Sequence, residues 1–497
     1  MWDNSSRSAF RESGLQSVYG TGRDAWLIIL SRSCRMFAYG ASSLILALFF
    51  AELKISDAQI GLFMTLTLVG DVMLSLLLTL IADRVGRRRT LCVGSLLMIG
   101  SGITFATCEN YWLLLLAAVV GVISATGGDF GPFRAIEEST MAELTTPATR
   151  ADVLVWYVTA ASLGSSIGSE MSGRIIESLR ARDGWTLLDA YHGCFWLYVV
   201  FGLLNMASCL LLSDRCELKK KPQQQVVETQ PLLSEASSST GQEVVEAESK
   251  TATGKSSWVA QISRETRGVM TVLWFLLMVD SLADGMVSMA LTTYYMDQKF
   301  HLPKSTLGDI FSASYFLSTC SNIFAGPLAR HIGLVNTMVF THVPSSAAVL
   351  LFPLPQSVSV SVALLLLRVG LNNMDQAPRA ALIAAVVRPE ERTAVMGITS
   401  MLRTLTMTAG PTITGFLAGD DRFWVAFVAA GALRLFYDLG LFAMFINIKL
   451  HKHEPTVDGE EERLPAEESQ RAHVHLPYGL LQHDRPTQNP ILGGNKV

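Results

Sequence analysis

The stretch Ala82-Asp83-Arg84-Val85-Gly86-Arg87-Arg88-Arg89-Thr90 is a short basic turn between two long apolar runs, 62–81 and 91–107. Its five charged side chains cannot lie in hydrocarbon, so the turn must lie in water or at a headgroup surface. Each flanking run is close to the about 20 residues that a membrane-crossing helix needs. The stretch therefore predicts two transmembrane helices joined at the membrane surface, and its four arginines predict the cytoplasmic side.

The composition of the whole chain is that of an integral membrane protein. Of its 497 residues, 50% are hydrophobic and only 16% are charged, whereas soluble domains carry roughly a quarter of charged residues. The small net charge of −4 gives no support for nucleic-acid binding. The seven cysteines lack metal-ligand or disulfide spacing, and the first 24 residues contain no signal-peptide core. We therefore expect no metal site and no cofactor.

Apolar runs long enough to cross a membrane recur in two blocks. We expect six helices in the first block, near residues 26–51, 59–82, 90–109, 111–135, 151–176 and 191–213. We expect six more in the second, near 269–296, 306–328, 334–353, 357–386, 393–418 and 423–447. The sequence thus predicts an all-α membrane protein with twelve transmembrane helices in two six-helix pseudo-repeats.

The two blocks divide the chain into five expected segments. These are a cytoplasmic N-terminal tail (1–24), a six-helix bundle (25–213), a linker (214–267), a second six-helix bundle (268–447) and a C-terminal tail (448–497). The linker and the C-terminal tail are polar and have few aromatic residues, so they cannot bury enough apolar surface to fold. We expect both to be disordered and cytoplasmic.

Lysine and arginine set the expected orientation. They are more frequent in the loops that lie on the side of the basic turn than in the opposite loops. We therefore expect both termini to be cytoplasmic, in a protein of the plasma membrane or of a vacuolar or endosomal membrane.

An internal repeat is visible between the two blocks. Residues 147–150 (Pro-Ala-Thr-Arg) match 389–392 (Pro-Glu-Glu-Arg), and the same offset pairs Gly168 with Gly410. The basic turn has a weaker echo at 329–333, Ala-Arg-His-Ile-Gly. The repeat favours duplication of a six-helix unit, whose solute site is expected between the halves near the middle of the membrane.

With these features the sequence resembles the major facilitator superfamily of secondary transporters, over nearly all of residues 25–447. The most specific part of the resemblance is the basic turn, which is similar to that family's signature between helices 2 and 3. The matching residues are Asp83, Arg84, Gly86, Arg87 and Arg88. One position departs, because Thr79 stands where the family often has a glycine that permits close helix approach. The resemblance implies a carrier with a small-molecule solute and membrane lipids as partners, but it does not identify the solute.

Charged residues within the first block are candidates for the solute or proton pathway. They are Arg35, Asp71, Asp129, Arg134 and Glu170. An arginine inside a membrane costs about 2.5 kcal/mol or more, so Arg35 should face a cavity or an acid, unless its helix begins late and the side chain reaches the surface. Asp71 can bind and release a proton, or it can be the structural partner of an arginine. Glu170 is either a pore acid or neutralised by Arg174, four residues on.

The second block has its own set of charged candidates. They are Asp280, Asp284, Arg368, Asp375 and Arg379. Asp280 and Asp284 are four residues apart on one helix face, and two such carboxylates cannot both ionise easily in a low dielectric. One of them is therefore expected to carry a proton, unless a cation such as Arg35 or Arg368 neutralises it.

A second group of residues is expected to form a cytoplasmic gate around the basic turn. Its members are Asp83, Arg84, Gly86, Arg87, Arg88, Glu137, Glu138 and Arg150. Arg134 and Glu138 lie four residues apart, so they can pair along one helix face. The gate would hold ionic contacts in one state of the carrier and release them in the other.

The expected linker contains a short sequence that is similar to an acidic dileucine sorting signal. Glu228 precedes Leu232 and Leu233 with three residues between, the spacing at which a sorting adaptor would bind. Such short motifs also match by chance, and the alternative is a solvated linker.

These observations predict a secondary transporter that works by alternating access and is coupled to protons through Asp280, Asp284 or Asp71. Buried arginines favour an anionic solute and buried acids a cationic one, and the sequence leaves this choice open. The alternative is a membrane sensor that keeps the transporter fold without transport. No enzyme is expected, because no nucleophile with a base and no metal cluster is evident.

Overall fold

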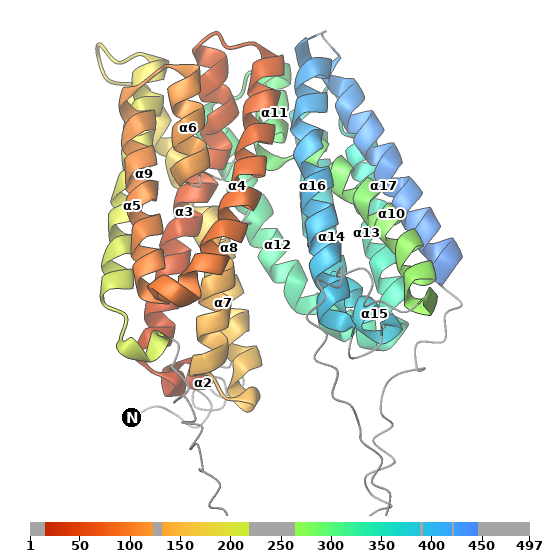
Figure 1. Ribbon diagram of the computed structural model, residues 1–497. Helices are drawn as coiled ribbons and strands as arrows, with labels where there is room; N and C mark the ends of the chain where they lie inside the picture. Colours follow the sequence, from red (N-terminus) through yellow and green to blue (C-terminus); the bar gives the residue numbers. More distant parts are fainter. Residues whose placement is uncertain are drawn as a thin grey trace, which may run out of the picture. The chain divides into compact units, whose positions relative to one another are not determined.

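The computed structural model describes residues 15–121, 123, 132–217, 264–387, 391–419 and 422–445, and the regular structure in these ranges is helical throughout (Figure 1). Several predicted features lie outside the described residues: the first 14 residues of the N-terminal tail, the C-terminal tail, most of the linker, Asp129, Glu228, Leu232 and Leu233. The side chains of Asp83 and Arg84 also lie outside the described part.

A short helix, α2 (Leu15–Thr21), precedes the first block. The helices of this block, called here the N-terminal half, are α3 (Arg23–Glu52), α4 (Asp57–Val85), α5 (Arg87–Thr107), α6 (Tyr111–Gly121), α7 (Pro132–Leu144), α8 (Pro147–Arg180) and α9 (Leu187–Leu210), followed by the 3-10 turn η1 (Asp214–Cys216).

The second block is called here the C-terminal half. Its helices are α10 (Arg264–Met286), α11 (Met289–Phe300), α12 (Lys304–Ile332), α13 (Leu334–Leu351), α14 (Val358–Asn372), the 3-10 turn η3 (Asn373–Asp375), α15 (Gln376–Val386), α16 (Arg392–Gly419) and α17 (Phe423–Phe445).

The all-α prediction is confirmed, and each expected span coincides with a described helix or with consecutive ones. In the described residues, eight helical stretches are long and apolar enough to cross a membrane. The span expected at 269–296 comprises α10 and α11, and the span at 357–386 comprises α14, η3 and α15. The span at 111–135 comprises α6 and the first residues of α7.

The end of the bundle that carries the α4–α5 turn is called here the basic end, and it also carries α2 and α15 (Figure 1). Gly86 in this turn has a φ of 108°, which L side chains rarely adopt, and its N–H bonds to the Ala82 carbonyl at 2.9 Å. In the α12–α13 turn Gly333 has a φ of 89° and bonds to the Ala329 carbonyl at 3.0 Å. The echo noted in the sequence is thus a repeat of turn geometry.

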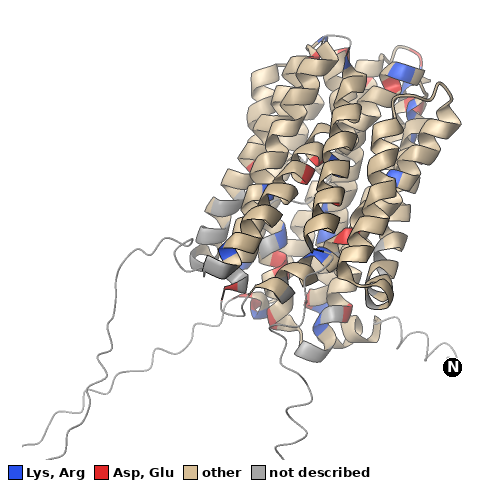
Figure 2. Cartoon of the chain, turned by 90° about the vertical axis from the view of Figure 1, so that its right-hand side faces the viewer, with Lys and Arg blue, Asp and Glu red and all other residues tan. Residues whose placement is uncertain are grey.

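Buried aromatic side chains fill the core of each half near the opposite end of the bundle. In the N-terminal half Phe50 packs against Phe63 with ring centroids 4.4 Å apart. In the C-terminal half Tyr295 packs against Phe427 at 4.6 Å. Figure 2 shows charged residues at the ends of the bundle and also at intermediate heights, where apolar packing alone would not need them.

Glycines let helices of one half approach closely. A Cβ atom on Gly168 of α8 would lie 2.1 Å from the Phe37 carbonyl oxygen of α3, and one on Gly164 would lie 2.5 Å from the Ser33 oxygen. Such distances are shorter than any real contact, so only glycine permits this crossing.

Gly168→Ala should therefore destabilise the protein by about 1–3 kcal/mol, the usual cost of overpacking against backbone. Thermal unfolding of the purified variant measures this effect. Gly100→Ala is the matched control, because a Cβ at Gly100 meets no atom within 4 Å. Equal unfolding midpoints for the two variants would contradict the tight α3–α8 crossing.

The two halves contact each other toward the opposite end. A Cβ on Gly173 of α8 would lie 2.4 Å from the Lys304 carbonyl oxygen of α12. The Tyr294 hydroxyl donates to the Asp57 carboxylate at 2.5 Å, and Glu177 accepts from the Lys304 backbone N–H at 3.0 Å. These contacts join α4 and α8 of the N-terminal half to α11 and α12 of the C-terminal half, at the end of the bundle opposite the basic end.

Candidate functional site

A buried ion pair connects α3 and α7 in the N-terminal half. The Arg35 guanidinium donates to both carboxylate oxygens of Glu137 at 2.8 Å, and both side chains are almost fully buried. The Tyr157 hydroxyl of α8 donates to the same carboxylate at 2.8 Å. This two-point geometry is the strong form of the arginine–carboxylate contact. Arg35 thus faces an acid, one of the alternatives that its position in the sequence left open.

Aromatic rings enclose this pair. The Arg35 guanidinium lies 4.6 Å from the centre of the Phe133 ring, and the Arg32 guanidinium lies 3.9 Å from the centre of the Tyr157 ring. We name Arg32, Arg35, Phe133, Glu137 and Tyr157 the N-terminal cluster.

The structure gives the partners of two predicted gate residues, Glu137 and Glu138. The sequence predicts Glu137 beside Asp83 and Arg84, whose side chains lie outside the described part, and the Glu137 carboxylate binds Arg35 and Tyr157. Glu137 and Glu138 are consecutive residues, so they point in different directions from α7. Glu138 is half exposed and pairs with Arg134 at 2.7 Å, as expected from the four-residue spacing.

Other residues of the predicted gate bind within the N-terminal half. Arg87 pairs with Glu143 at 3.0 Å, and Arg88 pairs with Asp214. Arg150 donates to the Ala142 carbonyl at 2.8 Å, near the C-terminal end of α7. The acids in these pairs come from α7 and η1, and no spacing in the sequence singled them out.

Glu217 closes the basic turn from the start of the linker. Its carboxylate accepts from the backbone N–H groups of Arg87 at 2.8 Å and of Arg88 at 3.2 Å, at the N-terminal end of α5. A carboxylate at this place satisfies free N–H groups and complements the helix dipole. The beginning of the linker is therefore fixed on the signature turn, which the sequence did not predict.

The reactivity of Cys216, next to Glu217, can be used to test the contact between Glu217 and the basic turn. Burial raises the pKa of its thiol to about 12, with the Asp24 carboxylate adding to the effect. A thiol with so high a pKa carries almost no thiolate near neutral pH, so maleimide should label Cys216 slowly. We expect Glu217→Ala to accelerate this labelling, measured by mass spectrometry, while labelling of the less buried Cys108 stays unchanged. Unchanged labelling of Cys216 in the variant would count against the contact.

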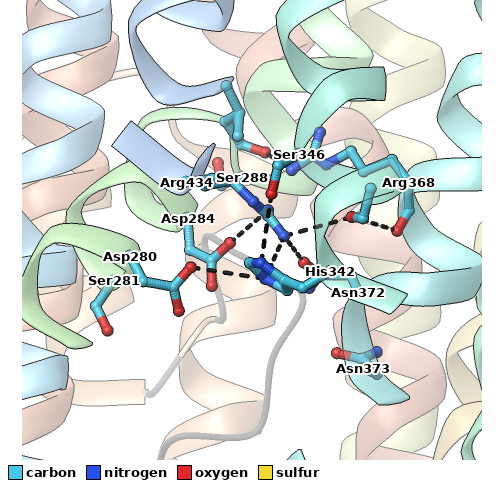
Figure 3. Close-up of polar contacts among 12 residues, drawn as sticks. Asp280, Ser281, Asp284, Ser288, His342, Ser346, Arg368, Asn372, Asn373 and Arg434 are labelled. Carbon is cyan, nitrogen blue, oxygen red and sulfur yellow. Dashed lines mark hydrogen bonds and ion pairs between the residues drawn. The ribbon is translucent and has the colours of Figure 1, made fainter. Parts of the chain in front are cut away.

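A larger polar network lies inside the C-terminal half, with Arg434 of α17 at its centre (Figure 3). The fully buried Arg434 guanidinium donates to Asp284 at 2.8 Å and to His342 Nε2 at 2.8 Å, and it also binds Asn372. The Asp284 side chain keeps 28% of its surface exposed. Arg434 therefore connects a buried histidine to a carboxylate that reaches accessible space.

His342 of α13 is held from its other ring nitrogen by Asp438 of α17. Nδ1 lies 2.7 Å from the Asp438 carboxylate, which also accepts from the Ser346 hydroxyl at 2.7 Å. Because Arg434 is always a donor, Nε2 must accept, and we assign the proton of the neutral ring to Nδ1. His342, Asp438 and Arg434 thus form one continuous chain of hydrogen bonds.

Asp280 of α10 is the exceptional member of this region. It is fully buried, and neither carboxylate oxygen has a hydrogen-bond partner in the described part of the chain. The nearest basic groups are His342 Nε2 and Arg379 Nη2, each 3.6 Å away. A buried carboxylate without hydrogen bonds is costly in the ionised form and calls for a proton or a closer cation.

The remaining arginines of the C-terminal half differ in their partners. Arg379 binds Asp375, as the four-residue spacing allows. Arg368 donates to the Thr292 hydroxyl at 3.1 Å and to the Val287 carbonyl, and Arg403 donates to the Ser281 hydroxyl at 3.1 Å. Among the described residues, no carboxylate lies within ion-pair distance of Arg368 or Arg403.

Arg368 also explains how α10 and α11 can be separate helices within one expected span. The backbone leaves the helix at Val287–Ser288, which frees carbonyl groups that hydrocarbon cannot satisfy. The Val287 carbonyl accepts from Arg368, and the Met286 carbonyl accepts from the Thr414 hydroxyl at 2.7 Å.

The sequence-predicted acids do not all converge. Asp71 is buried in α4 of the N-terminal half, whereas Asp280 and Asp284 belong to the network of the C-terminal half. Glu170 binds Arg174 at 2.5 Å, and Arg174 also binds Asp309 of α12 at 3.0 Å. Glu170 is therefore part of a contact between the halves and is neutralised there, which was one of its two expected roles.

Sequence reasoning missed Arg434, Asp438 and His342. Arg434 and Asp438 are a charged pair four residues apart within the apolar run 423–447. Charged residues inside such a run are a signal of function in membrane proteins, so this signal was available. His342 carried no comparable signal, because a lone histidine in an apolar helix is usually a packing residue.

The basic neighbours of Asp280 and Asp284 differ from Arg35 and Arg368, the cations that the sequence suggested. Asp284 pairs with Arg434, and Asp280 lies between His342 and Arg379. These neighbours come from α13, α15 and α17, far away in the sequence.

A hollow of about 570 Å³ lies at the basic end between α2, α7 and α8, lined among others by Ser17 and Asp152. None of the candidate residues lines it, so we do not assign the solute site to this hollow.

Comparison with known proteins gives the family of this fold. A relative from Saccharomyces cerevisiae, described as the uncharacterized membrane protein YJR124C, is 32% identical over 441 residues, which is 86% of this chain and 95% of that protein. The solved nucleoside transporter NupG matches 85% of this chain and 99% of its own, with a TM-score of 0.61 and 12% identity. The inward-open xylose transporter XylE from E. coli matches 84% of this chain and 95% of its own, with a TM-score of 0.60 and 11% identity.

The family model of the Major Facilitator Superfamily matches residues 28–263 and 273–487. This match covers most of the chain. The helical fold and the basic turn with Gly86 agree with it. The chain belongs to the Major Facilitator Superfamily, and it is a transporter of this family.

Proposed function

We propose that this protein is a secondary active transporter that moves a small anionic solute together with protons by alternating access. The single observation that carries the proposal is the buried Asp280 carboxylate, which has no hydrogen bond to any described residue and lies among cations of the C-terminal half. Membership of the family supports transport of a small solute, and the proton and the charge of the solute are our additions.

The surroundings of Asp280 support the proton as the coupled ion. Burial without hydrogen bonds disfavours the ionised carboxylate, whereas the Arg379 guanidinium 3.6 Å away favours it. A proton removes the charge, and loss of the proton restores the attraction to Arg379 and changes the contact with His342, also 3.6 Å away. The two protonation states thus favour different arrangements of α10, α13 and α15, which is the property that coupling requires.

The partners of the arginines support an anionic solute. In the described residues, Arg368 and Arg403 make hydrogen bonds only to neutral groups, whereas Asp284 and Asp375 are each paired with an arginine. A guanidinium without a nearby carboxylate offers free attraction to an anion, and its planar donors suit carboxylates and phosphates. The structural relatives do not make this choice, because likeness at 11% or 12% identity concerns the fold alone.

The contacts between the halves support alternating access. Gly173 and Gly308 meet where α8 crosses α12, and Gly61 and Gly415 meet where α4 crosses α16. Small residues at such crossings let helices slide or rock without side-chain clashes. The state described here has these contacts closed at the opposite end, so the alternative state would open them and close the basic end.

The distribution of lysine and arginine supports cytoplasmic termini, with the basic end on the cytoplasmic side. We further propose the plasma membrane or an endosomal or vacuolar membrane as its place. The sequence at Glu228, Leu232 and Leu233 would recruit a sorting adaptor in the second case.

A thermal-shift screen of the purified protein tests the solute class, because a ligand that binds only the native state raises the unfolding midpoint. The probes are sodium salts of phosphate, sulfate, acetate, succinate and citrate, against chlorides of choline and tetraethylammonium. We expect at least one anion to stabilise the protein by an amount that grows with its concentration.

Variants of Arg368 connect this shift to the proposed site. Arg368→Ala should abolish the anion-dependent shift, while Arg368→Lys should keep part of it, because lysine retains the charge without the planar donors. Stabilisation by an organic cation but by no anion would overturn the solute class. Stabilisation without any flux in liposomes would instead favour a sensor.

A further inference from the structure

We propose that His342 shares the coupling proton with Asp280, and that uptake of this proton releases Arg434 from the histidine. The inference rests on the proposed proton coupling and names the residues that perform it. His342, Asp280 and Arg434 come from three helices, α13, α10 and α17. They meet within the buried network of the C-terminal half (Figure 3).

The groups around His342 define where a proton can go. Asp438 of α17 binds Nδ1 at 2.7 Å, and Ser346 of the same helix as His342 lies 3.3 Å from this nitrogen. Nδ1 therefore already holds the proton of the neutral ring. An added proton must bind to Nε2.

Nε2 has two charged neighbours. Arg434 Nη2 donates to it at 2.8 Å, and Asp280 Oδ1 lies 3.6 Å away. The Tyr437 ring packs edge-on against the imidazole, with centroids 5.5 Å apart, and contributes no charge. Arg379 reaches the histidine only through Asp280, whose other oxygen it approaches at 3.6 Å.

A proton on Nε2 changes the preferred hydrogen-bond partner of this nitrogen from Arg434 to Asp280. The nitrogen changes from acceptor to donor, so it can no longer accept from Arg434, and two cationic groups at hydrogen-bond distance repel each other. Asp280 becomes the natural acceptor, because its carboxylate has no hydrogen bond to the described residues. The proton therefore lies between His342 and Asp280, whichever of the two holds it formally.

Arg434 keeps other hydrogen-bond partners after its contact with His342 is lost. It keeps its contacts with Asn372 and with Asp284, the carboxylate that is 28% exposed. Repulsion from the protonated histidine shifts the guanidinium toward this accessible side. A positive group thereby becomes available to the anionic solute when the proton is bound.

The charge balance of the region also indicates that binding of the proton favours binding of an anion. In the described part, four carboxylates (Asp280, Asp284, Asp375 and Asp438) face four guanidinium groups (Arg368, Arg379, Arg403 and Arg434). With a neutral His342 the set is balanced, and one added proton makes it positive. Binding of an anion restores the balance, so proton and anion favour each other's binding reciprocally.

Nuclear magnetic resonance of the full-length protein, labelled with ¹³C and ¹⁵N in histidine and reconstituted in lipid nanodiscs, tests the inference. The chain contains nine histidines, and His342→Gln identifies the signal of His342. We expect this signal to show the neutral Nδ1–H form at pH 8 and to convert to imidazolium on acidification to pH 5.

Two variants separate the two neighbours of Nε2. Asp280→Asn removes the acceptor, so conversion should need about tenfold or more higher proton concentration, the effect of losing one close opposite charge. Arg434→Gln removes the competing cation but keeps amide hydrogen bonding, so conversion should need less acid. His192 is the matched control, because its Nδ1 binds the Phe105 carbonyl at 2.8 Å in the N-terminal half, and its signal should not respond to either variant.

A His342 signal that stays neutral down to pH 5, or that ignores both variants, would overturn the inference. The proposed function has a separate readout, which is solute accumulation driven by a pH gradient in liposomes. If His342→Gln accumulates solute as the natural protein does, His342 is not the proton partner although coupling stands. If His342 titrates as expected without any driven transport, the proton switch stands and the proposed function fails.

Discussion

Asp280→Asn should abolish solute accumulation driven by a pH gradient and still allow solute exchange across liposomes at equal pH. Asparagine is neutral, so the charged groups of the region keep one positive charge in excess and can bind an anion without the coupling proton. A carrier in that form can exchange solute but neither takes up nor releases the proton, and the gradient no longer drives it. Counterflow of labelled solute measures exchange, and uptake under an imposed gradient measures coupling.

The structure provides a matched control for this variant. Asp309→Asn changes a half-exposed carboxylate that pairs with Arg174 at the contact between the halves. We expect Asp309→Asn to retain driven uptake, because exposed ion pairs contribute little. Driven uptake by Asp280→Asn at the rate of the natural protein would remove Asp280 from the coupling site.

Glu137→Gln should destabilise the protein by about 3–5 kcal/mol, the usual cost of breaking a buried ion pair. Arg35 and Glu137 are almost fully buried, so water cannot replace the lost ionic contact. Replacing both residues, as in Arg35→Met with Glu137→Met, should recover much of the loss, because no charge then stays buried. Thermal unfolding of the single and double variants in detergent gives the coupling between the residues.

Arg134 and Glu138 form the comparison pair on the same helix. They bind at 2.7 Å, but their side chains are 49% and 40% exposed, so breaking their contact should have a small effect. If Glu137→Gln and Glu138→Gln lower the unfolding midpoint equally, the buried Arg35–Glu137 pair does not stabilise the protein more than the exposed Arg134–Glu138 pair.

The fold could be predicted from the sequence because its signals are local. Apolar runs of membrane-spanning length and the charged turn at Ala82–Thr90 need only neighbouring residues to be recognised. The contacts of residues four apart were also predictable, as in Arg134–Glu138 and Glu170–Arg174. Helix geometry alone determines these contacts.

The candidate site could be predicted only in part, because its contacts join distant segments. Asp284 is 150 residues from Arg434, and Asp280 lies beside a histidine from another helix. Nothing in the spacing of these residues shows that α10, α13 and α17 bring them together. The sequence therefore identified Asp280 and Asp284 but missed Arg434, His342 and Asp438, the groups at the centre of the network.

The basic turn also combines a feature that neighbouring residues predict with a contact that they do not. Its arginines and Gly86 indicated a tight turn between two helices, and the positive φ of Gly86 explains the glycine. Its closure by Glu217 depends on how the start of the linker returns to α5, which no local pattern gives.

The most direct test of coupled transport uses liposomes that contain the purified protein and a pH-sensitive dye. An anion that stabilises the protein in the thermal-shift screen is added outside at lower external pH, and luminal pH and solute content are followed together. The account predicts that solute and protons enter together, that Asp280→Asn abolishes this joint entry, and that Asp309→Asn does not. Entry of the solute at a rate that is independent of the pH gradient, with no change in luminal pH, would contradict it.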